Sequence, residues 1–178
     1  MPKTQIPKEC ISELYHVADS VVPVRLITAS PSFLPGYTGR LVTSKNPNQA
    51  WETVRLKLKF HIESYSSEKM SVRMTCAIDY LGYLDDVFYA TDDGDIHLEN
   101  DLWRDPYDFS EGAAWECINT GVMGDHDGQP RRVFQIRNLG YDKWVKVERL
   151  DNFMYLRLTG EGSGSSFMLG KVSDIDYY

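Results

Sequence analysis

The 178-residue sequence predicts an all-β protein, and three observations carry this prediction. No segment combines ten or more residues of helical periodicity with a capping residue. Apolar and polar residues alternate instead in many short runs, most clearly over residues 54–61, as in a strand with one buried face. A short motif, in which a small residue precedes a large aromatic one, also recurs about once in each third of the chain. The aromatic residues of this motif are Trp51, Trp115 and Phe167.

Hydrophobic alternation and turn residues together predict twelve short strands, four in each third. The expected strands are 11–18, 21–28, 39–43, 50–61, 70–78, 87–90, 96–99, 114–119, 132–138, 144–148, 154–159 and 167–172. Pro23 places the second strand at a sheet edge or at a strand start, because proline lacks the amide hydrogen that a central strand needs. The Asp-Asp-Gly-Asp sequence at 92–95 predicts a hairpin turn. Three longer connections, 30–38, 100–112 and 121–130, are expected to be loops.

The spacing of these strands predicts how they assemble. Many short strands at regular intervals indicate a barrel or a sandwich, and the threefold recurrence favours a closed barrel with a hairpin cap, which has few open edges. The thirds align as Ile11/Met70/Arg132, Val22/Val87/Trp144, Gly39/Ile96/Met154 and Ala50/Ala114/Ser166. Trp51, Trp115 and Phe167 would then meet near a pseudo-threefold axis. We expect residues 1–10 to form a loose arm and residues 11–178 to form a single domain.

Composition narrows the setting in which the protein acts. No run of apolar residues approaches the length of a membrane span, and the first residues lack the apolar stretch of a secretory signal. The three cysteines, Cys10, Cys76 and Cys117, are an odd number without a framework spacing, which favours reduced thiols. These features predict a cytoplasmic protein, or one released without a standard signal peptide.

Acidic residues are concentrated in the middle third of the chain. The net charge is −7, and between Asp79 and Asp127 the only basic residue apart from histidine is Arg104. Such a segment repels phosphate backbones, so nucleic acid is not an expected partner. Two interpretations stay open: a solvated acidic surface that maintains solubility, or a site for a basic ligand, a cation or a positively charged protein.

With its threefold pattern, the sequence resembles β-trefoil proteins. The triplet Gln49-Ala50-Trp51 is similar to the Gln-x-Trp mark of ricin-type lectin repeats, and the segments ending in Trp115 and Phe167 are degenerate versions. This resemblance covers most of the chain from about Ile11. It implies a pseudo-threefold barrel with a hairpin cap and a sugar site built from an aspartate, an aromatic residue and an asparagine.

The nearest match to this aspartate, aromatic and asparagine set lies in the middle third, at a different spacing. It consists of Asp85 or Asp86, Trp103 and Asn100. The surrounding segment places large aromatic residues among carboxylates, a combination that suits sugar faces and hydroxyls or a basic partner. The predicted ligand-binding residues are Asp86, Asn100, Asp101, Trp103, Asp105 and Tyr107. The alternative is that Trp103 and Phe109 only plug the cap of the barrel.

The chain also resembles fungal β-trefoil protease inhibitors of the mycocypin class, in which long loops perform the function. That resemblance implies a function for the loops 30–38, 100–112 and 121–130. We therefore expect a non-enzymatic binding protein, a lectin-like module that binds carbohydrate through its middle third. The alternative is a loop-based protease inhibitor or another protein-binding module.

Catalytic and metal-binding signatures are weak. His16, His61, His97 and His126 lie in unrelated segments, and no nucleophile motif accompanies them. The Gly-Asp-His-Asp-Gly run at 124–128 has no second histidine or cysteine nearby, so we expect an exposed acidic turn there and not a metal site. The sequence predicts no enzymatic activity, no metal and no cofactor.

Overall fold

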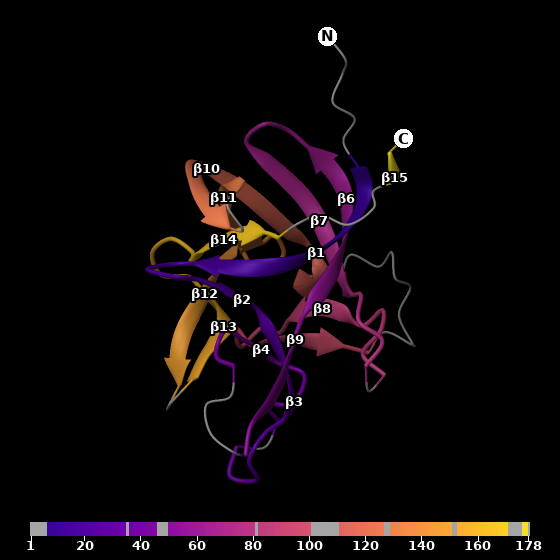
Figure 1. Ribbon diagram of the computed structural model, residues 1–178, viewed down its shortest axis with the longest axis vertical. Helices are drawn as coiled ribbons and strands as arrows, with labels where there is room; N and C mark the ends of the chain where they lie inside the picture. The colour runs from indigo at the N-terminus through magenta and orange to yellow at the C-terminus, as the bar shows by residue number, and fades with distance from the viewer. Residues whose placement is uncertain are drawn as a thin grey trace.

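The computed structural model describes residues 7–34, 36–45, 50–80, 82–100, 111–126, 129–150, 153–170 and 176–177. In these residues the chain is all-β, as predicted: it has fifteen strands and one short 3-10 helix, η1 (Glu111–Ala113) (Figure 1). No helix in this part of the chain is long or apolar enough to cross a membrane. The strands are β1 (Pro7–Val17), β2 (Val21–Pro23), β3 (Arg25–Ala29), β4 (Leu41–Val42), β5 (Glu52–Arg55), β6 (Lys57–Tyr65), β7 (Lys69–Cys76), β8 (Val87–Ala90), β9 (Ile96–Glu99), β10 (Trp115–His126), β11 (Gln129–Asn138), β12 (Lys143–Leu150), β13 (Phe153–Thr159), β14 (Ser166–Leu169) and β15 (Asp176–Tyr177).

Six of these strands close into a barrel. Strand β1 pairs with β6, β6 with β7, β7 with β10, β10 with β11, β11 with β14, and β14 again with β1, all antiparallel. The ring forms because its strands alternate: in β6, Leu58 and Phe60 are fully buried, whereas Lys57 and Lys59 point away from the core. A closed ring leaves none of its six strands with an open edge.

Three hairpins, β3–β4, β8–β9 and β12–β13, stand beside the barrel and contact one another in a cycle. Each hairpin forms one bridge with the next, and the three bridging pairs are Arg40 with His97, Asp95 with Arg157, and Tyr155 with Val42. Each bridge carries an equivalent backbone hydrogen bond, from Leu98 N to Gly39 O (2.9 Å), from Leu158 N to Gly94 O (2.8 Å) and from Thr43 N to Met154 O (2.9 Å). Position for position, the three hairpins therefore contact one another in the same way.

This cycle corrects the predicted alignment of the thirds by two residues. Gly39 and Met154 are equivalent, as expected, but their counterpart in the middle third is Gly94 and not Ile96. Gly94 has a φ of +93° and lies so close to the third hairpin that an added Cβ would be 3.0 Å from the carbonyl oxygen of Leu158. Glycine meets both requirements, because it has no Cβ and adopts positive φ without strain.

The core is divided into two hydrophobic clusters, which corrects the expectation that three aromatic rings meet at one axis. Trp115 and Phe167 belong to the main cluster inside the barrel and its hairpins. Trp51 belongs to a second cluster, where its ring centroid lies 4.3 Å from that of Phe153. Trp115 packs edge-on against Phe88, with ring centroids 4.9 Å apart, and its indole N–H donates to the Phe88 carbonyl oxygen (3.0 Å).

Several predicted boundaries differ from the structure. Two expected strands are each split in two, one at Val24 between β2 and β3 and the other at Leu56 between β5 and β6; together with β15, this gives fifteen strands where twelve were expected. Of residues 121–130, expected to be a loop, the described residues 121–126 and 129–130 form the ends of β10 and β11, with a register shift between Asn119 and Met123. The expected arm overlaps a strand, because β1 begins at Pro7 and pairs there with Tyr177.

We predict that Trp115→Ala lowers the free energy of unfolding by about 3–5 kcal/mol, because it removes a fully buried indole and leaves the Phe88 carbonyl without its donor. Urea denaturation followed by far-ultraviolet circular dichroism measures the change. Tyr65→Ala is the matched control, since Tyr65 is 52% exposed and its loss should change stability by less than about 0.5 kcal/mol. Equal effects of the two substitutions would contradict the packing of Trp115 in the main cluster.

Candidate functional site

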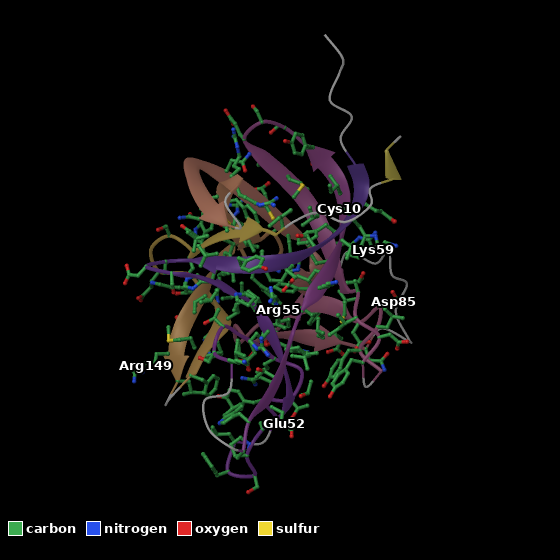
Figure 2. All side chains as sticks on the ribbon, viewed as in Figure 1. Cys10, Glu52, Arg55, Lys59, Asp85 and Arg149 are labelled. Carbon is green, nitrogen blue, oxygen red and sulfur yellow. The ribbon has the colours of Figure 1, made fainter. Side chains whose placement is uncertain are left out.

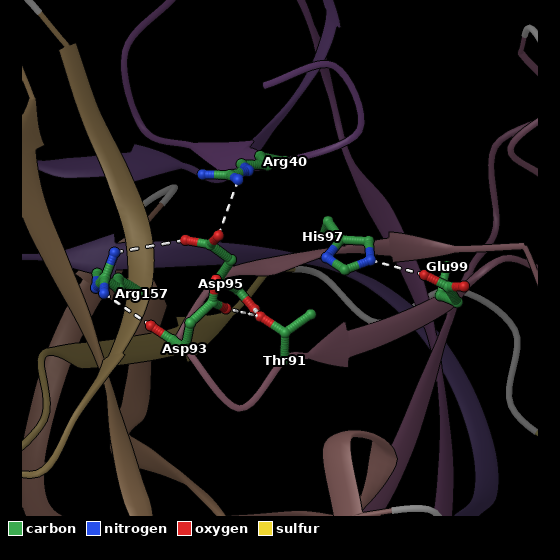
Figure 3. Close-up of polar contacts among 7 residues, drawn as sticks. All are labelled: Arg40, Thr91, Asp93, Asp95, His97, Glu99 and Arg157. Atoms are coloured by element: carbon green, nitrogen blue, oxygen red, sulfur yellow. Dashed lines mark hydrogen bonds and ion pairs between the residues drawn. The ribbon is translucent and has the colours of Figure 1, made fainter. Parts of the chain in front are cut away.

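An ion-pair junction ties the three hairpins together where they meet. The carboxylate of Asp95, the residue directly before β9, accepts a hydrogen bond from Arg40 Nη2 of the first hairpin (2.9 Å) and another from Arg157 Nη1 of the third (3.4 Å) (Figure 3). Arg157 Nη2 also donates to the backbone oxygen of Asp93 (2.7 Å). The Asp95 side chain is only 17% exposed, so these charge-assisted bonds are partly shielded from water.

The same arginine connects the junction to the second hydrophobic cluster. The Arg40 guanidinium carbon lies 4.3 Å from the centroid of the Tyr37 ring, within the range of a cation–π contact. Tyr37 in turn stands edge-on to Phe153, with ring centroids 5.9 Å apart, and to Trp51, at 6.1 Å. Tyr37 is thus held between a charged junction and an aromatic cluster.

Tyr37 belongs to the connection between β3 and β4, of which we call the described residues 30–34 and 36–38 the Phe33 loop. The Phe33 side chain is 71% exposed, whereas Pro31 is buried. Hydrogen bonds brace the loop from inside: Leu34 N donates to Pro31 O (3.0 Å) and Ser30 Oγ donates to Leu34 O (3.3 Å). The loop follows β3 and lies at one end of the molecule's long axis, whereas β15 lies toward the other end (Figure 1). A supported loop therefore presents a large apolar side chain to solvent.

The predicted ligand-binding residues lie mainly outside the described part of the chain. Asp101, Trp103, Asp105 and Tyr107 fall in residues 101–110, which the structure does not describe, as does Phe109. Asn100 is exposed at the end of β9. Asp86 precedes β8 and is only 9% exposed. The structure thus brings Asp86 and Asn100 together at the open end of the hairpin β8–β9, because the residues next to them, Val87 and Glu99, are cross-strand partners.

Asp86 has neighbours of its own charge. Burial raises the pKa of its carboxyl, and the carboxylates of Glu99 and Asp85 raise it further. Burial together with the Asp86 charge raises the pKa of the nearby Tyr83 phenol. Asp85 adopts a φ of +66°, an uncommon conformation for a residue with a side chain, and points outward (Figure 2). We call Asp85, Asp86 and Glu99 the carboxylate cluster.

The structure also joins residues that no sequence pattern connects. On the outside of the barrel, His61 Nε2 lies 3.0 Å from Thr75 Oγ1 and His61 Nδ1 lies 3.2 Å from Glu9 Oε1. A hydroxyl, an imidazole and a carboxylate in that order resemble a nucleophile with its base. However, Thr75 pairs with Lys59 of β6 and with Val87 of β8, so both sides of its strand are occupied and the backbone there offers no oxyanion donors. The three side chains meet because β1, β6 and β7 pair side by side, and the alternation within one strand could not predict such a contact.

The described residues were compared with the requirements of a metal site and of a reactive thiol. No group of three or more His, Cys, Asp or Glu side chains among them could hold a metal ion. Cys10, Cys76 and Cys117 are buried and unpaired. Burial raises the pKa of the Cys10 thiol to about 11 and that of the Cys117 thiol to about 12, which keeps both protonated and unreactive at neutral pH.

The fold and these sites define an all-β protein with a closed six-strand barrel. No family model matches the chain, and no curated protein matches it. Among solved structures, the chain is similar to the crystal structure of the lysenin pore, with 13% sequence identity and a TM-score of 0.49. The match covers 93% of this chain and 48% of that one, so the chain spans about half of that protein's length. A likeness of this size carries no argument about function.

We predict that Asp95→Asn lowers the free energy of unfolding by about 1–3 kcal/mol, because Arg40 and Arg157 lose their shared charge partner. Urea denaturation at low ionic strength measures the change. Asp92→Asn in the same turn is the matched control, because Asp92 is exposed and its replacement should have almost no effect. If the two variants are equally stable, the junction does not tie the hairpins together.

We predict that Asp86→Asn stabilises the protein at pH 7–8. Because the folded state raises the pKa of Asp86, the ionised carboxylate destabilises the fold at pH values above that pKa, and this cost disappears as the pH falls toward the unfolded value. The variant should therefore be more stable than the wild type at pH 7–8, and the difference should shrink toward pH 4. Thermal unfolding at a series of pH values measures it, and a difference independent of pH would rule out ionisation of Asp86 as its cause.

Proposed function

We propose that the chain is a β-trefoil. The closed ring of six strands and the three hairpins support this proposal, and so does the cycle of equivalent bridges among those hairpins. In a β-trefoil, three equivalent units each contribute two barrel strands and one hairpin. Here the units would be β1 to β6, β7 to β10 and β11 to β14, and the sequence resemblance at Gln49-Ala50-Trp51 agrees with that division.

We propose further that the protein is a non-enzymatic binding protein that engages a protein partner, such as a protease, through the Phe33 loop. The exposure of Phe33 on a braced loop is the observation that carries this proposal. Covering an exposed phenylalanine removes a large apolar area from water, at about 25 cal/mol per Å². A loop that already holds its shape loses little entropy on binding, so more of this gain appears as affinity. The loop therefore suits an apolar pocket on a partner.

Carbohydrate binding in the middle third is the second candidate. The exposure of Tyr80 favours it: this ring is 43% exposed beside exposed Asp79, in the loop that leads to Asp86. An open aromatic face flanked by carboxylates can stack on a sugar and accept hydrogen bonds from its hydroxyls. The predicted partner Trp103 would add to this face, which keeps the lectin-like function as a proposal beside the first.

One experiment tests both candidates: purified protein is measured against a panel of serine and cysteine proteases and against a glycan array. The first proposal predicts inhibition of a protease, and Phe33→Ala should weaken it at least tenfold, a loss of about 1.4 kcal/mol or more. Tyr65→Ala is the matched control, since it removes another exposed ring, on β6. Glycan binding that survives Phe33→Ala, together with no protease inhibition, would instead favour the second candidate.

A further inference from the structure

Arg25 of β3 and Arg55 of β5 place two positive charges side by side on one face of the sheet, since they are cross-strand partners. The next pair along, Val24 and Leu56, is joined by a backbone hydrogen bond from Leu56 N to Val24 O (3.2 Å). Hydrogen-bonded and non-hydrogen-bonded pairs alternate in antiparallel strands, so the two arginines form a non-hydrogen-bonded pair. Side chains come closest in such pairs, and like charges directly opposite each other destabilise a sheet. This pair of arginines therefore calls for an explanation.

The guanidinium of Arg25 is held in place by uncharged groups. Its Nε donates to Thr53 Oγ1 (2.8 Å), and its Nη2 donates to the Thr53 backbone oxygen (3.1 Å). Among the described residues, no carboxylate forms an ion pair with Arg25. Burial and the charge of Arg55 lower the pKa of Arg25, and the charge of Glu13 offsets them only in part. In the described part of the chain, Arg25 Nη1 makes no hydrogen bond and is not enclosed, so a ligand can reach it.

Arg55 is paired with the carboxylate of Glu13. Its Nε donates to Glu13 Oε2 (2.7 Å), and its Nη2 donates to Glu13 Oε1 (3.0 Å) and to the Tyr15 hydroxyl (2.6 Å). The Arg55 side chain is still 52% exposed. Lys57, the cross-strand partner of Glu13, is exposed and adds a further positive charge. One described carboxylate thus stands against three cations, and this surface keeps a positive charge.

Other arginines of this protein that are buried or half-buried are neutralised. Four of them form ion pairs with an aspartate or a glutamate, namely Arg40, Arg73, Arg137 and Arg157. Carboxylates are abundant, because the chain has 26 acidic against 19 basic residues. Binding the hydroxyl and carbonyl oxygens of Thr53 needs no charge, since a neutral amide N–H donates to both kinds of acceptor. A structural role alone therefore leaves the charge of Arg25 unexplained.

We propose that Arg25 and Arg55 form a binding site for one oxyanion group of a ligand, which is a carboxylate, a sulfate or a phosphate. The site lies on the shared face of β3 and β5. Arg55 lies near the middle of the molecule's long axis, whereas Glu52, at the other end of β5, lies nearer to the Phe33 loop (Figure 2). The site is therefore separate from that loop and independent of both functions proposed above.

Two arginines in this arrangement suit an oxyanion better than a neutral group. Each guanidinium uses its Nε and Nη2 internally, which fixes its plane and leaves Nη1 to donate outward. Charge-assisted N–H···O bonds from two guanidinium groups to one anion are short and strong. Because Thr53 and Glu13 hold the two side chains before binding, little side-chain entropy is lost. An anion beside both arginines also replaces their mutual repulsion with attraction to a shared charge.

Two-dimensional 1H–15N NMR of the protein tests the proposal, because the Nε–Hε groups of Arg25 and Arg55 report on the site directly. Sodium sulfate, sodium phosphate and sodium acetate are added separately, with sodium chloride adjusted to keep the ionic strength constant. The Arg25 signal should shift to saturation with a Kd of about 1–5 mM for at least one of these oxyanions. A preference for sulfate and phosphate identifies a tetrahedral group, and a preference for acetate identifies a carboxylate.

Variants test whether the arginine pair holds the anion. Arg25→Gln should weaken binding about tenfold or more, whereas Lys146→Gln, which removes an exposed positive charge from β12, should leave it unchanged. Arg25→Gln also removes hydrogen bonds to Thr53, so a second variant is needed that gains binding.

Glu13→Gln removes the carboxylate that competes for Arg55, so the anion should bind about threefold more tightly or better, a gain that unfolding cannot produce. The absence of a saturable shift, an unchanged affinity in Arg25→Gln, or an equal loss in Lys146→Gln would overturn the proposal. An affinity that does not rise in Glu13→Gln would overturn it as well.

Discussion

The mutual contact of the three hairpins is the constraint on which the rest of the structure depends. A two-stranded hairpin is at best marginally stable on its own, and β4 contains only two residues. They support one another through three equivalent bridges, and Asp95 adds a charge bond to each of the other two hairpins. Because Arg40 also covers the Tyr37 ring, the same junction reaches the base of the Phe33 loop. A partly buried electrostatic contact in one third of the chain thereby positions a surface feature in another.

The Phe33 loop and the carboxylate cluster both lie in connections between strands, outside the barrel. The barrel and the contacts among the hairpins satisfy the backbone, so the connections between strands are free to carry side chains that the core does not need. One connection presents Phe33, an apolar group exposed to water, and another encloses Asp86, a charged group shielded from it. Each departs from the usual rule for its residue type, and such departures occur at binding sites more often than elsewhere.

Local pattern was sufficient to predict the all-β class and the cores of most strands. The strands β8 and β9 have the predicted bounds. The predicted Asp-Gly turn joins them, and its Gly94 adopts the positive φ that favours glycine. Alternation could not reveal that Trp51 packs with Phe153, because that contact joins the first and third parts of the chain and depends on how the hairpins meet. For the same reason, the sequence singled out Asp86 as one of six candidate residues, but it could not show that Glu99, the cross-strand partner of Val87, lies near it. Strand register decides which charged residues become neighbours and how deeply they are buried, and a single sequence does not reveal that register.

The closure of the barrel has a consequence for how the chain is made. Strand β1 completes the ring by pairing with β14, and Leu14 lies opposite Leu169, almost the whole chain apart. During synthesis, β1 leaves the ribosome well before its neighbour β14. Until then, β1 and β11 each present an unpaired edge to other nascent chains. Folding of such a topology is governed by contacts between distant residues and is therefore slow compared with that of helical proteins of similar size.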